Sequence, residues 1–598
     1  PLPGSADAML LRFLLIAAVA VFLFDPHVAL AGQGTPPAKQ PTATGKDGGA
    51  ATVDALGTQA AIDTLRRGGN AVDAAVAAAG VLGVVEPFSC GIGGGGFMVI
   101  RTRKGEVTTI DSRELSPRSM RPDSFMENGA PLPFNDARYS GLSAGVPGTV
   151  EGWDSALDEY GTKDLDDVLE AGIRVAENGF VVDQTFFDQT TPNVPWFDDI
   201  PSTAAIYLDP DGTPRDIGTV LKNPDMARTY RLIARRGTDG FYEGPVADAM
   251  AEASQHPPVG PNADHVWRPG RMTEDDVDDY YAPEREPARI RYRGLDIWGM
   301  GPPSSGGSTV GEALNILEGY QLSAADRTRA FHLLLEANRF AFADRNAYLA
   351  DPRLFDVPLE GLLSDSFAAE RRALINEHQA GTSPVAPGDP YDNQDDRGHG
   401  GHASATISHP HQSTTHLVVS DRKGTVVSYT FTIESTGGNG IVVPGWGFLL
   451  NNELTDFNFD STTHPNRADS RKRPRSSMAP TIMTRHGKPY LAVGSPGGST
   501  IIGTVAQVLF DRIDMGRSLP EAIAAPRAVN RNTTTSTAEP AFTSSPEGQL
   551  LASQYRHAFA PQGEIGAVTG LDFLPGNRVV AAAEPVRRGG GSAAVVRP

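Results

Sequence analysis

The chain has 598 residues, and its 72 acidic residues outnumber its 52 basic ones, which gives a formal net charge of −20. This excess of acid disfavours nucleic acid and anionic membrane surfaces as partners, because both reward clustered Lys and Arg. The hydrophobic share of 39% is that of a globular protein, and the length predicts two or more domains or one large layered unit.

Residues 1–31 have the pattern of a secretory signal peptide. Arg12 precedes an apolar run that ends at Phe24, and the small-residue sequence Val28-Ala29-Leu30-Ala31 follows. The run is short for a membrane span, so we expect cleavage after residue 31, with an uncleaved N-terminal anchor as the alternative. The mature protein is then expected to be secreted, or to lie in the periplasm or on the exterior of the cell envelope, without stable membrane insertion.

The next segments predict a disordered lead-in followed by helices. Residues 32–48 are rich in Gly, Pro, Thr and Lys, a composition typical of a disordered segment. The Ala-rich stretch 53–80 predicts two helices that are separated at Gly68-Gly69, with Asn70 as the N-cap of the second. Cys90 is the single cysteine and therefore cannot form an internal disulfide.

The glycine run at residues 91–96 formally matches G-x-G-x-x-G. A helix precedes it and a strand follows it, which is the reverse of the order in a dinucleotide-binding fold, so we expect close backbone packing instead. Residues 97–114 alternate around Lys104-Gly105 and predict a β-hairpin.

The middle of the chain, residues 150–400, is mostly helical in pattern. Residues 331–351 predict a well-formed amphipathic helix whose charged side chains form a solvated face. Residues 391–413 are polar and predict a linker or mobile loop. The histidines near it lack the regular spacing of zinc ligands, so we expect no metal there; they are His399, His402, His409, His411 and His416.

A second hairpin is predicted where the strands begin, at residues 414–432. If its polar turn Asp421–Gly424 is centred near Lys423, Thr414 faces Thr432. Directly opposed residues have Cβ atoms roughly 5 Å apart, so the two hydroxyls can form a hydrogen bond. Cross-strand threonine pairs are also ordinary sheet chemistry, so this pattern leaves a structural and a catalytic interpretation open.

A threonine becomes a nucleophile when it is the first residue of a chain, because its own α-amino group, with a pKa of about 7.7–8.0, can accept the hydroxyl proton. Thr414 would qualify only if the bond Ser413–Thr414 were cut. Thr414 Oγ could attack the carbonyl of Ser413 to give an ester that water hydrolyses, and a mobile segment upstream would permit this.

Three further motifs carry polar groups of possible catalytic use. Gly497-Gly498 follows a strand and precedes a helix, where backbone N–H groups suit an anion or an oxyanion, although such pairs often only make turns. Ser476-Ser477 could bind a carboxylate or cap a turn. Arg113 could pair with a carboxylate in a bidentate manner or form an internal salt bridge with Glu114.

Together these motifs resemble the γ-glutamyltransferases, also called glutathione hydrolases, of the N-terminal-nucleophile superfamily. The matching segments run in the family's order from about residue 50 to 530 and include GGNAVDAAVA (68–77), DSREL (111–115), GVPGTVEGW (145–153), GPPSSGG (301–307), TTHLVV (414–419), GFLLNNELTDF (447–457), RPRSSMAPTI (473–482) and GSPGGST (494–500).

The resemblance implies an α+β fold, a four-layer αββα sandwich built by both subunits of a self-cleaved precursor. It places the cut at Ser413–Thr414, between a large subunit of residues 49–413 and a small one of residues 414–598. It implies small-molecule γ-glutamyl donors such as glutathione, amino acids or peptides as acceptors, and no cofactor. The residue roles carried over are nucleophile (Thr414), its hydrogen-bond partner (Thr432), oxyanion hole (Gly497, Gly498), carboxylate binding (Arg113, Ser476, Ser477) and ammonium binding (Glu453, Asp456).

The chain departs from the family pattern in two places. Glu434 stands where many members have Asn, so three carboxylates would surround one ammonium, and we expect one of them to be protonated in the free protein. The segment 457–475 is short and polar where many members have a longer lid, which predicts an open pocket. The alternatives are a cephalosporin or glutaryl acylase, a poly-γ-glutamate depolymerase and an inactive binding homologue.

Overall fold

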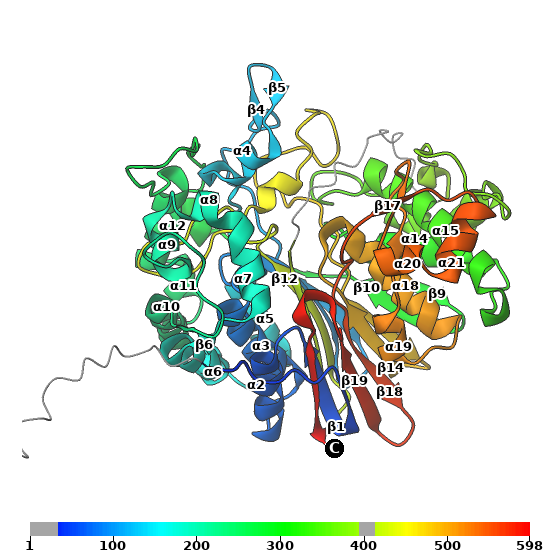
Figure 1. Cartoon of the computed structure of the whole chain (residues 1–598), viewed down its shortest axis with the longest axis horizontal. Coiled ribbons are helices and arrows are strands. Elements are labelled where there is room, and N and C mark those ends of the chain that lie inside the picture. The colour runs from blue at the N-terminus through cyan, green and yellow to red at the C-terminus, as the bar shows by residue number, and fades with distance from the viewer. Residues whose placement is uncertain (1–33, 394–412) are drawn as a thin grey trace, which may run out of the picture.

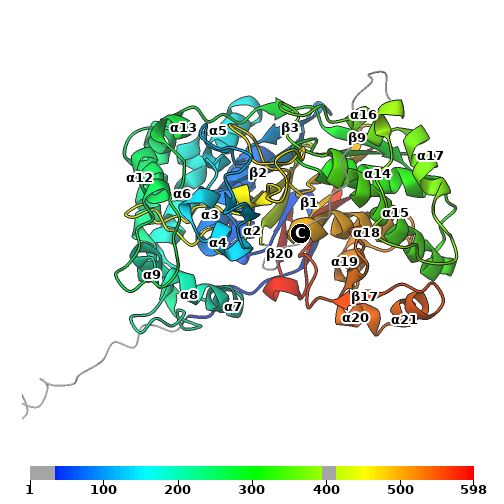
Figure 2. The ribbon, with the colours of Figure 1, turned by 90° about the horizontal axis from the view of Figure 1, so that it is seen from above.

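A computed structural model describes residues 34–393 and 413–598, and it has two groups of helices on either side of a central sheet (Figure 1). The longer helices of the first group are α2 (Ala55–Arg66), α3 (Ala71–Val85), α5 (Thr149–Tyr160), α6 (Leu165–Asn178), α7 (Gln184–Thr190), α9 (Pro201–Tyr207), α10 (Pro224–Arg236) and α12 (Pro245–Gln255). Those of the second group are α14 (Gly306–Glu318), α15 (Arg327–Tyr348), α17 (Asp365–Ala373), α18 (Ile501–Ile513), α19 (Leu519–Ala524) and α21 (Pro546–Ser553). Seen from above, the two groups lie on opposite sides of the molecule (Figure 2).

Thirteen strands of the described residues form one hydrogen-bonded sheet. They are β1 (Thr42–Thr52), β2 (Gly95–Arg101), β3 (Val107–Asp111), β8 (Glu284–Arg285), β9 (Ala288–Tyr292), β10 (Leu295–Gly299), β11 (Thr415–Asp421), β12 (Val426–Thr432), β13 (Thr481–Arg485), β14 (Lys488–Gly494), β18 (Thr569–Leu574), β19 (Arg578–Ala583) and β20 (Ser592–Arg597). Their order is β8-β3-β2-β12-β11-β1-β19-β18-β14-β13-β10-β9, and β20 pairs with β1. Every pairing within this sheet is antiparallel, and β1 joins its two halves.

The two halves of the sheet pack against each other. Side chains of β2, β11 and β12 share a hydrophobic cluster with side chains of β13, β14, β18 and β19. The hydroxyl of Ser428 on β12 donates to the carbonyl of Val493 on β14, and that of Thr569 on β18 donates to the carbonyl of His416 on β11. Two larger clusters fill the space between each half and its own group of helices. The fold is therefore mixed helix and sheet, with three successive hydrophobic interfaces.

Several local predictions are confirmed. The helices α2 and α3 are separated at Gly68-Gly69, and Asn70 caps α3 in a capping box with Asp73. The hairpin β2–β3 turns at residues 102–106, as the alternation around Lys104-Gly105 predicted. The glycine run before it does pack closely, since a Cβ on Gly93 or Gly94 would lie 2.0 Å or less from a backbone oxygen.

Two predictions are wrong. Residues 42–48 of the expected disordered lead-in are part of β1, because their backbone pairs with β11, β19 and β20. The charged face expected on residues 331–351 is not solvated, since every residue of α15 from Ala330 to Tyr348 is buried. Its charges find partners inside the protein: Arg339 pairs with Glu336 on the same helix, and Asp344 pairs with Arg371 of α17. Helical periodicity could not distinguish this paired interior from a wet surface.

Among the described residues, no helix is long and apolar enough to cross a membrane. The predicted signal peptide lies outside the described residues, and so do residues 394–412 of the predicted linker with four of its histidines.

Candidate active site

The predicted threonine pair exists. In the hairpin of β11 and β12, Thr415 pairs with Phe431 and His416 with Thr430, which is the register that the sequence indicated. Thr414 and Thr432 continue this register, and their hydroxyl oxygens lie 3.0 Å apart. Both residues are buried, with 4% and 2% of their surface exposed.

The backbone at Thr414 is strained. Its φ is +108°, a region that a β-branched residue rarely adopts. Such a conformation costs on the order of 1–3 kcal/mol and persists only where the surroundings hold it. The chain runs unbroken through Ser413 and Thr414, so the nitrogen of Thr414 is here an amide.

A network of hydrogen bonds surrounds the Ser413–Thr414 bond. The amide of Ser413 donates to the carbonyl of Glu434 at 3.0 Å, and its hydroxyl donates to that of Ser89 at 2.9 Å. On the other side, the guanidinium of Arg588 donates to the carbonyl of Thr414 and to the hydroxyl of Ser89, both at 2.6 Å. The bond is thus held from two sides by groups that the sequence did not single out.

Nine of the predicted site residues line one small cavity of about 30 Å³. They are Arg113, Thr414, Thr432, Glu434, Glu453, Asp456, Ser476, Ser477 and Gly498. These residues come from positions more than 380 apart in the sequence, at the carboxyl end of β12, the amino end of β11 and the loops around them. The open pocket expected from the short segment 457–475 is not seen in this uncleaved chain, where the cavity is small and the threonines are buried.

Arg113 and the acidic residues form one buried charge cluster. The guanidinium of Arg113 forms ion pairs with Glu453 and, at 2.6 Å, with Asp456, and it lies 3.8 Å from Glu114. The carbonyls of Pro474 and Arg475 accept its remaining hydrogen bonds. Burial raises the pKa of Glu453 well above its ordinary value despite the opposing charge of Arg113. Burial likewise raises the pKa of Glu114 to about 7.

Glu434 lies at the side of this cluster. Its φ is +75°, and its carboxylate accepts hydrogen bonds from the hydroxyl of Ser435 and, at 2.6 Å, from the amide of Asn452. Burial, and next the charge of Asp456, raise the pKa of the Glu434 carboxyl to about 7. The direction of this shift agrees with the expectation that one of the three acids is protonated when no cation is bound.

The hydroxyl groups of Ser476 and Ser477 act as acceptors in the structure, and their protons have no acceptor among the described residues. The hydroxyl oxygen of Ser476 accepts from the amide of Met478 at 3.1 Å, and that of Ser477 accepts from the guanidinium of Arg345 at 2.7 Å. Neither hydroxyl donates to another described group. Because each oxygen is occupied as an acceptor, each proton is available to an acceptor in the cavity.

Gly497 and Gly498 precede the helix α18, as predicted, and Gly498 begins a short 3₁₀ turn (Gly498–Thr500) that leads into the helix. Their φ values of +130° and +53° favour glycine. Among the described residues, neither amide N–H has a hydrogen-bond acceptor. Two unsatisfied amides at the start of a helix are suited to bind an anion.

Four of the five histidines expected not to bind metal lie outside the described residues, so that prediction stays untested. His416 is the one of the five that the structure describes; it is buried against Thr430, and burial lowers its pKa to about 3. Elsewhere, His332, Glu336 and His557 lie close together, but the two rings share a hydrogen bond of 2.8 Å and Glu336 pairs with Arg339.

Sequence reasoning missed four residues that form hydrogen bonds with the predicted site residues. They are Ser89, Arg345, Asn452 and Arg588. Asn452 lies inside the quoted segment GFLLNNELTDF, directly before Glu453, and Ser89 lies two residues before the glycine run, so their positions were a usable signal. Arg588 lies at the far end of the chain, in RRGGG, and nothing in its local sequence pointed to Thr414.

The comparisons with known proteins agree on one family. A family model described as gamma-glutamyltranspeptidase matches residues 57–594. The glutathione hydrolase proenzyme of Bacillus subtilis subsp. natto is 41% identical over 489 residues, which covers 81% of this chain and 80% of that relative. The acylase ACY 1 proenzyme of Pseudomonas sp. strain V22 is 36% identical over 498 residues, which covers 81% of this chain and 83% of the relative. The crystal structure of a cephalosporin acylase from Bacillus halodurans matches with a TM-score of 0.79 and 28% identity, over 96% of this chain and 99% of that one.

Proposed function

The chain belongs to the gamma-glutamyltranspeptidase family, and from that premise we propose that it is a self-processing γ-glutamyltransferase and glutathione hydrolase with Thr414 as nucleophile. The observation that carries the proposal is the contact of 3.0 Å between the hydroxyls of Thr414 and Thr432 at the wall of a cavity that contains both an arginine and carboxylates. A γ-glutamyl group has a carboxylate and an ammonium on one carbon, and this cavity offers a partner for each.

The first proposed step is cleavage of the Ser413–Thr414 bond. Thr414 Oγ1 adds to the carbonyl carbon of Ser413, the C–N bond breaks, and the nitrogen of Thr414 takes a proton to become a free amine. Water then hydrolyses the resulting ester, which leaves a carboxylate on Ser413 and restores the hydroxyl of Thr414. The positive φ of Thr414 supports this step, because cleavage releases the strain that this backbone conformation stores.

Cleavage would divide the chain into a large subunit that ends at residue 413 and contains all of β1, and a small subunit of residues 414–598, and the two would remain together. Strands of both parts alternate in the sheet, since β1 and β2 flank the β11–β12 hairpin, which supports one folded unit. We read its three hydrophobic interfaces as those of a four-layer αββα sandwich. Removal of residues 1–31 as a signal peptide would place the enzyme outside the cytoplasm.

In the catalytic cycle, the free amine of Thr414 takes the proton of its own hydroxyl, and Oγ1 attacks the γ-carbonyl of the donor. The amides of Gly497 and Gly498 stabilise the negative charge that develops on the carbonyl oxygen. The leaving amine takes the proton and departs, and a γ-glutamyl ester of Thr414 remains. Water or the amine of an amino acid or peptide then attacks this ester and regenerates the enzyme. None of these steps needs a cofactor.

Recognition of the donor uses the charge cluster. The substrate carboxylate would bind Arg113 and the hydroxyl protons of Ser476 and Ser477, and its ammonium would bind Glu453 and Asp456. In the structure Arg113 pairs with these same two acids. The bound amino acid therefore replaces one set of ion pairs with two complementary ones, and no charge remains buried without a partner. Glu434 adds a third acid beside the ammonium.

The alternative is an acylase, since an acylase proenzyme is among the relatives and a cephalosporin acylase among the similar structures. A glutaryl group has the carboxylate of a γ-glutamyl group but no ammonium. With a glutaryl donor, Arg113 would be the one cation shared by the donor carboxylate, Glu453 and Asp456, and no ammonium would offset these acids, which favours the γ-glutamyl donor. A poly-γ-glutamate depolymerase would use the same acyl group and differs only in the leaving group. An inactive binding homologue would have no need of the strained Thr414 or of its partner Thr432.

The test compares a γ-glutamyl anilide with a glutaryl anilide that is identical except for the ammonium. We expect the γ-glutamyl donor to be hydrolysed at least about a hundredfold faster, which corresponds to about 2.7 kcal/mol of discrimination. Equal rates would contradict the assignment of the ammonium site, and a preference for the glutaryl donor would make the protein an acylase.

Processing is tested separately on a denaturing gel. Wild-type protein is expected to give two fragments, and the Thr414→Ala variant one full-length chain without activity. Thr415→Ala is the matched control, because Thr415 is the adjacent buried threonine and its side chain has no hydrogen-bond partner among the described residues. A single full-length band for active wild-type protein would rule out the mechanism.

A further inference from the structure

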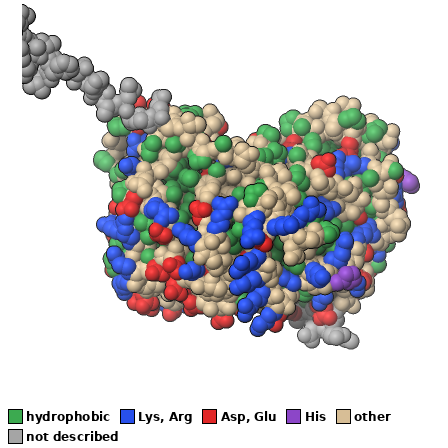
Figure 3. Space-filling model, turned by 90° about the horizontal axis from the view of Figure 1, so that it is seen from below, with side chains coloured by type: hydrophobic (Ala, Val, Ile, Leu, Met, Phe, Trp, Pro, Cys, Tyr) green, Lys and Arg blue, Asp and Glu red, His purple; other side chains and the backbone are tan. Residues whose placement is uncertain are grey.

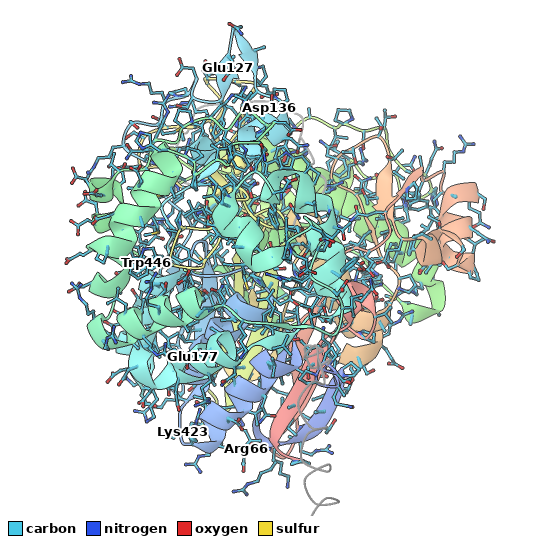
Figure 4. All side chains as sticks on the ribbon, turned by 60° about the vertical axis from the view of Figure 1, so that its left-hand side comes forward. Arg66, Glu127, Asp136, Glu177, Lys423 and Trp446 are labelled. Carbon is cyan, nitrogen blue, oxygen red and sulfur yellow. The ribbon has the colours of Figure 1, made fainter. Side chains whose placement is uncertain are left out.

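The cation that contacts Thr414 lies apart from the exposed cations of the sheet. In Figure 3, which views the molecule from below, Lys and Arg gather in a band over the end where the hairpins turn. Figure 4 labels Lys423 of the β11–β12 turn at that end, while Glu127 and Asp136 lie at the far end of the molecule. Thr414 is at the opposite end of β11 from its turn. Arg588, whose guanidinium donates to the carbonyl of Thr414, is therefore separate from the exposed band.

Ser89 is a buried serine whose hydroxyl group forms three hydrogen bonds. It lies just beyond the carboxyl end of α3. Its oxygen accepts from the guanidinium of Arg588 at 2.6 Å and from the hydroxyl of Ser413 at 2.9 Å. Its own proton is donated to the carboxylate of Glu86 at 3.3 Å. Because a hydroxyl has one proton and two acceptor positions, these three partners fix the orientation of the Ser89 side chain.

The two charged partners of Ser89 are themselves held in place. Glu86 and Arg588 form an ion pair with each other at 3.4 Å. Arg588 lies in the connection between β19 and β20, and its φ of +55° is uncommon for a residue other than Gly. Its amide donates to the carboxylate of Glu564 and its carbonyl accepts from the hydroxyl of Thr185, which hold this conformation. We call Glu86, Ser89 and Arg588 together the serine clamp.

Each residue of the Ser413–Thr414 bond is held at two points. The amide of Ser413 donates to the carbonyl of Glu434, and its hydroxyl donates to the serine clamp. The carbonyl of Thr414 accepts from the guanidinium of the clamp, and its hydroxyl contacts that of Thr432. Attack by a hydroxyl requires it to lie about 3–3.5 Å from the carbonyl carbon, and a displacement of about 1 Å can cost about a hundredfold in rate. Loss of one of these four contacts should therefore slow the cleavage.

The four contacts have different roles once the bond is cut. The two contacts of Thr414 remain with the nucleophile, so they serve both cleavage and turnover. The contact from Ser413 to Ser89 belongs to the other fragment, and Ser413 has no part in the transfer of a γ-glutamyl group. This contact therefore serves the uncut chain alone.

We propose that Ser89 is a positioning residue for self-cleavage, which holds Ser413 so that its carbonyl carbon faces Oγ1 of Thr414. The proposal rests on the self-processing function proposed above and adds to it a residue that acts on the precursor and not on the donor. Ser89 transfers no proton to the reacting atoms, because its proton is directed at Glu86.

The test follows cleavage of the full-length chain after pulse labelling, on a denaturing gel, and then measures kcat for a γ-glutamyl anilide on the cleaved material. Ser89→Ala and Ser413→Ala should each slow cleavage at least about tenfold, while kcat of the cleaved enzyme falls by at most about threefold. The double variant should cleave no more slowly than the slower single variant, because both substitutions remove the same contact. Ser254→Ala is the matched control. Ser254 is equally buried and donates to the carbonyl of Gly141 within the first group of helices, so its loss should leave cleavage within about twofold of wild type.

Three results would overturn the role of Ser89. They are cleavage of Ser89→Ala at the wild-type rate, effects of the two single substitutions that multiply in the double variant, and a loss of kcat as large as the loss of cleavage rate. If thermal unfolding shows that Ser89→Ala does not fold, Ser413→Ala decides alone, since it removes only the other end of the same contact. Failure of the proposed function gives a different result, because wild-type protein itself would then stay uncut.

Discussion

The two ends of the β11–β12 hairpin have opposite character. At its open end, Thr414 and Thr432 are buried beside carboxylates whose pKa values are raised by burial, as for Glu434. At its turn, seven residues further along each strand, Arg422 and Lys423 are exposed and lack ion pairs. A single hairpin thus connects an enclosed acidic cavity with an open basic surface, which the net charge of −20 does not reveal.

The difference lies in how charges act in the two environments. Inside the protein a charge is weakly screened, so each partner has a large effect and removing one leaves another buried and unpaired. On the surface a single charge is screened by salt over about 10 Å, so only a group of charges gives useful binding. Single substitutions should therefore strongly reduce stability and activity at the open end of the hairpin and change both very little at the turn.

The largest effect is expected for Arg113→Leu. It leaves the buried Glu453 and the partly buried Asp456 without their cation, so we expect about 3–5 kcal/mol of destabilisation and at least a loss of about a thousandfold in kcat/KM for a γ-glutamyl anilide. If this variant does not fold, Arg113→Lys is the second test. Lysine keeps the positive charge but cannot form the bidentate contact of a guanidinium, so kcat/KM should still fall at least about tenfold. Arg289→Lys, at an exposed pair with Asp296, is the control and should change nothing. Full activity of Arg113→Lys would contradict the role of Arg113.

A smaller loss is expected for Thr432→Val, which keeps the shape of the side chain and removes its hydroxyl. The bonds to the hydroxyl of Thr414 and from the amide of Glu434 are lost. We expect slower self-cleavage and a kcat lower by about a hundredfold. Thr430→Val in the same strand removes a bond to His416 instead, so it should cost about 1–3 kcal/mol of stability with kcat nearly unchanged. Equal kcat values for the two variants would mean that Thr432 is only structural.

Glu434→Gln is expected to change pH dependence. The pKa of Glu434 is raised to about 7, so the carboxyl ionises and gains affinity for an ammonium as pH rises through 7. KM for the γ-glutamyl donor should therefore fall by up to about tenfold between about pH 6 and 8, and Glu434→Gln should flatten this change. A glutaryl donor, which has no ammonium, gives the baseline. An unchanged KM profile in the variant would show that Glu434 does not face the ammonium.

The raised pKa of Glu434 also makes the stability of the fold depend on pH. A carboxyl whose pKa is higher in the folded than in the unfolded protein stabilises the fold at low pH, and this contribution is lost as pH rises through the folded value. Glu434→Gln should therefore lose less stability than wild type between about pH 5 and 8. Urea unfolding in a Thr414→Ala background measures this without self-cleavage.

The smallest effect is expected when four exposed cations at hairpin turns, Lys104, Arg422, Lys423 and Arg578, are replaced by Gln. Hydrolysis of a small γ-glutamyl anilide should stay within about twofold of wild type, because the screened surface charges lie at the opposite end of the sheet. A large loss of kcat would show that the two ends of the hairpin are coupled and do not act independently.

Local patterns in the sequence predicted local structure well. The N-cap at Asn70, the β2–β3 hairpin, the turn at Asp421–Gly424 and the glycine pair before α18 all depend on residues within a few positions of one another. The register of the hairpin alone predicted that Thr414 faces Thr432, because the position of the turn fixes which residues of the two strands lie opposite each other. The motifs that resemble the family then indicated which polar residues would meet around this pair, and the structure places nine of them at one cavity.

Tertiary structure decided what depends on distant segments. Sequence composition assigned residues 42–48 to a disordered lead-in and gave α15 a solvated face, but pairing of β1 with three strands and ion pairs inside the second group of helices reversed both predictions. The contact of Arg588 with Thr414, and the contacts of Arg101 with the turn carbonyls of Gly424 and Gly487, likewise join residues far apart in the chain. The sequence determined which groups are present, and folding decided which are buried together and which are exposed, because burial and pairing set how strongly each charge acts.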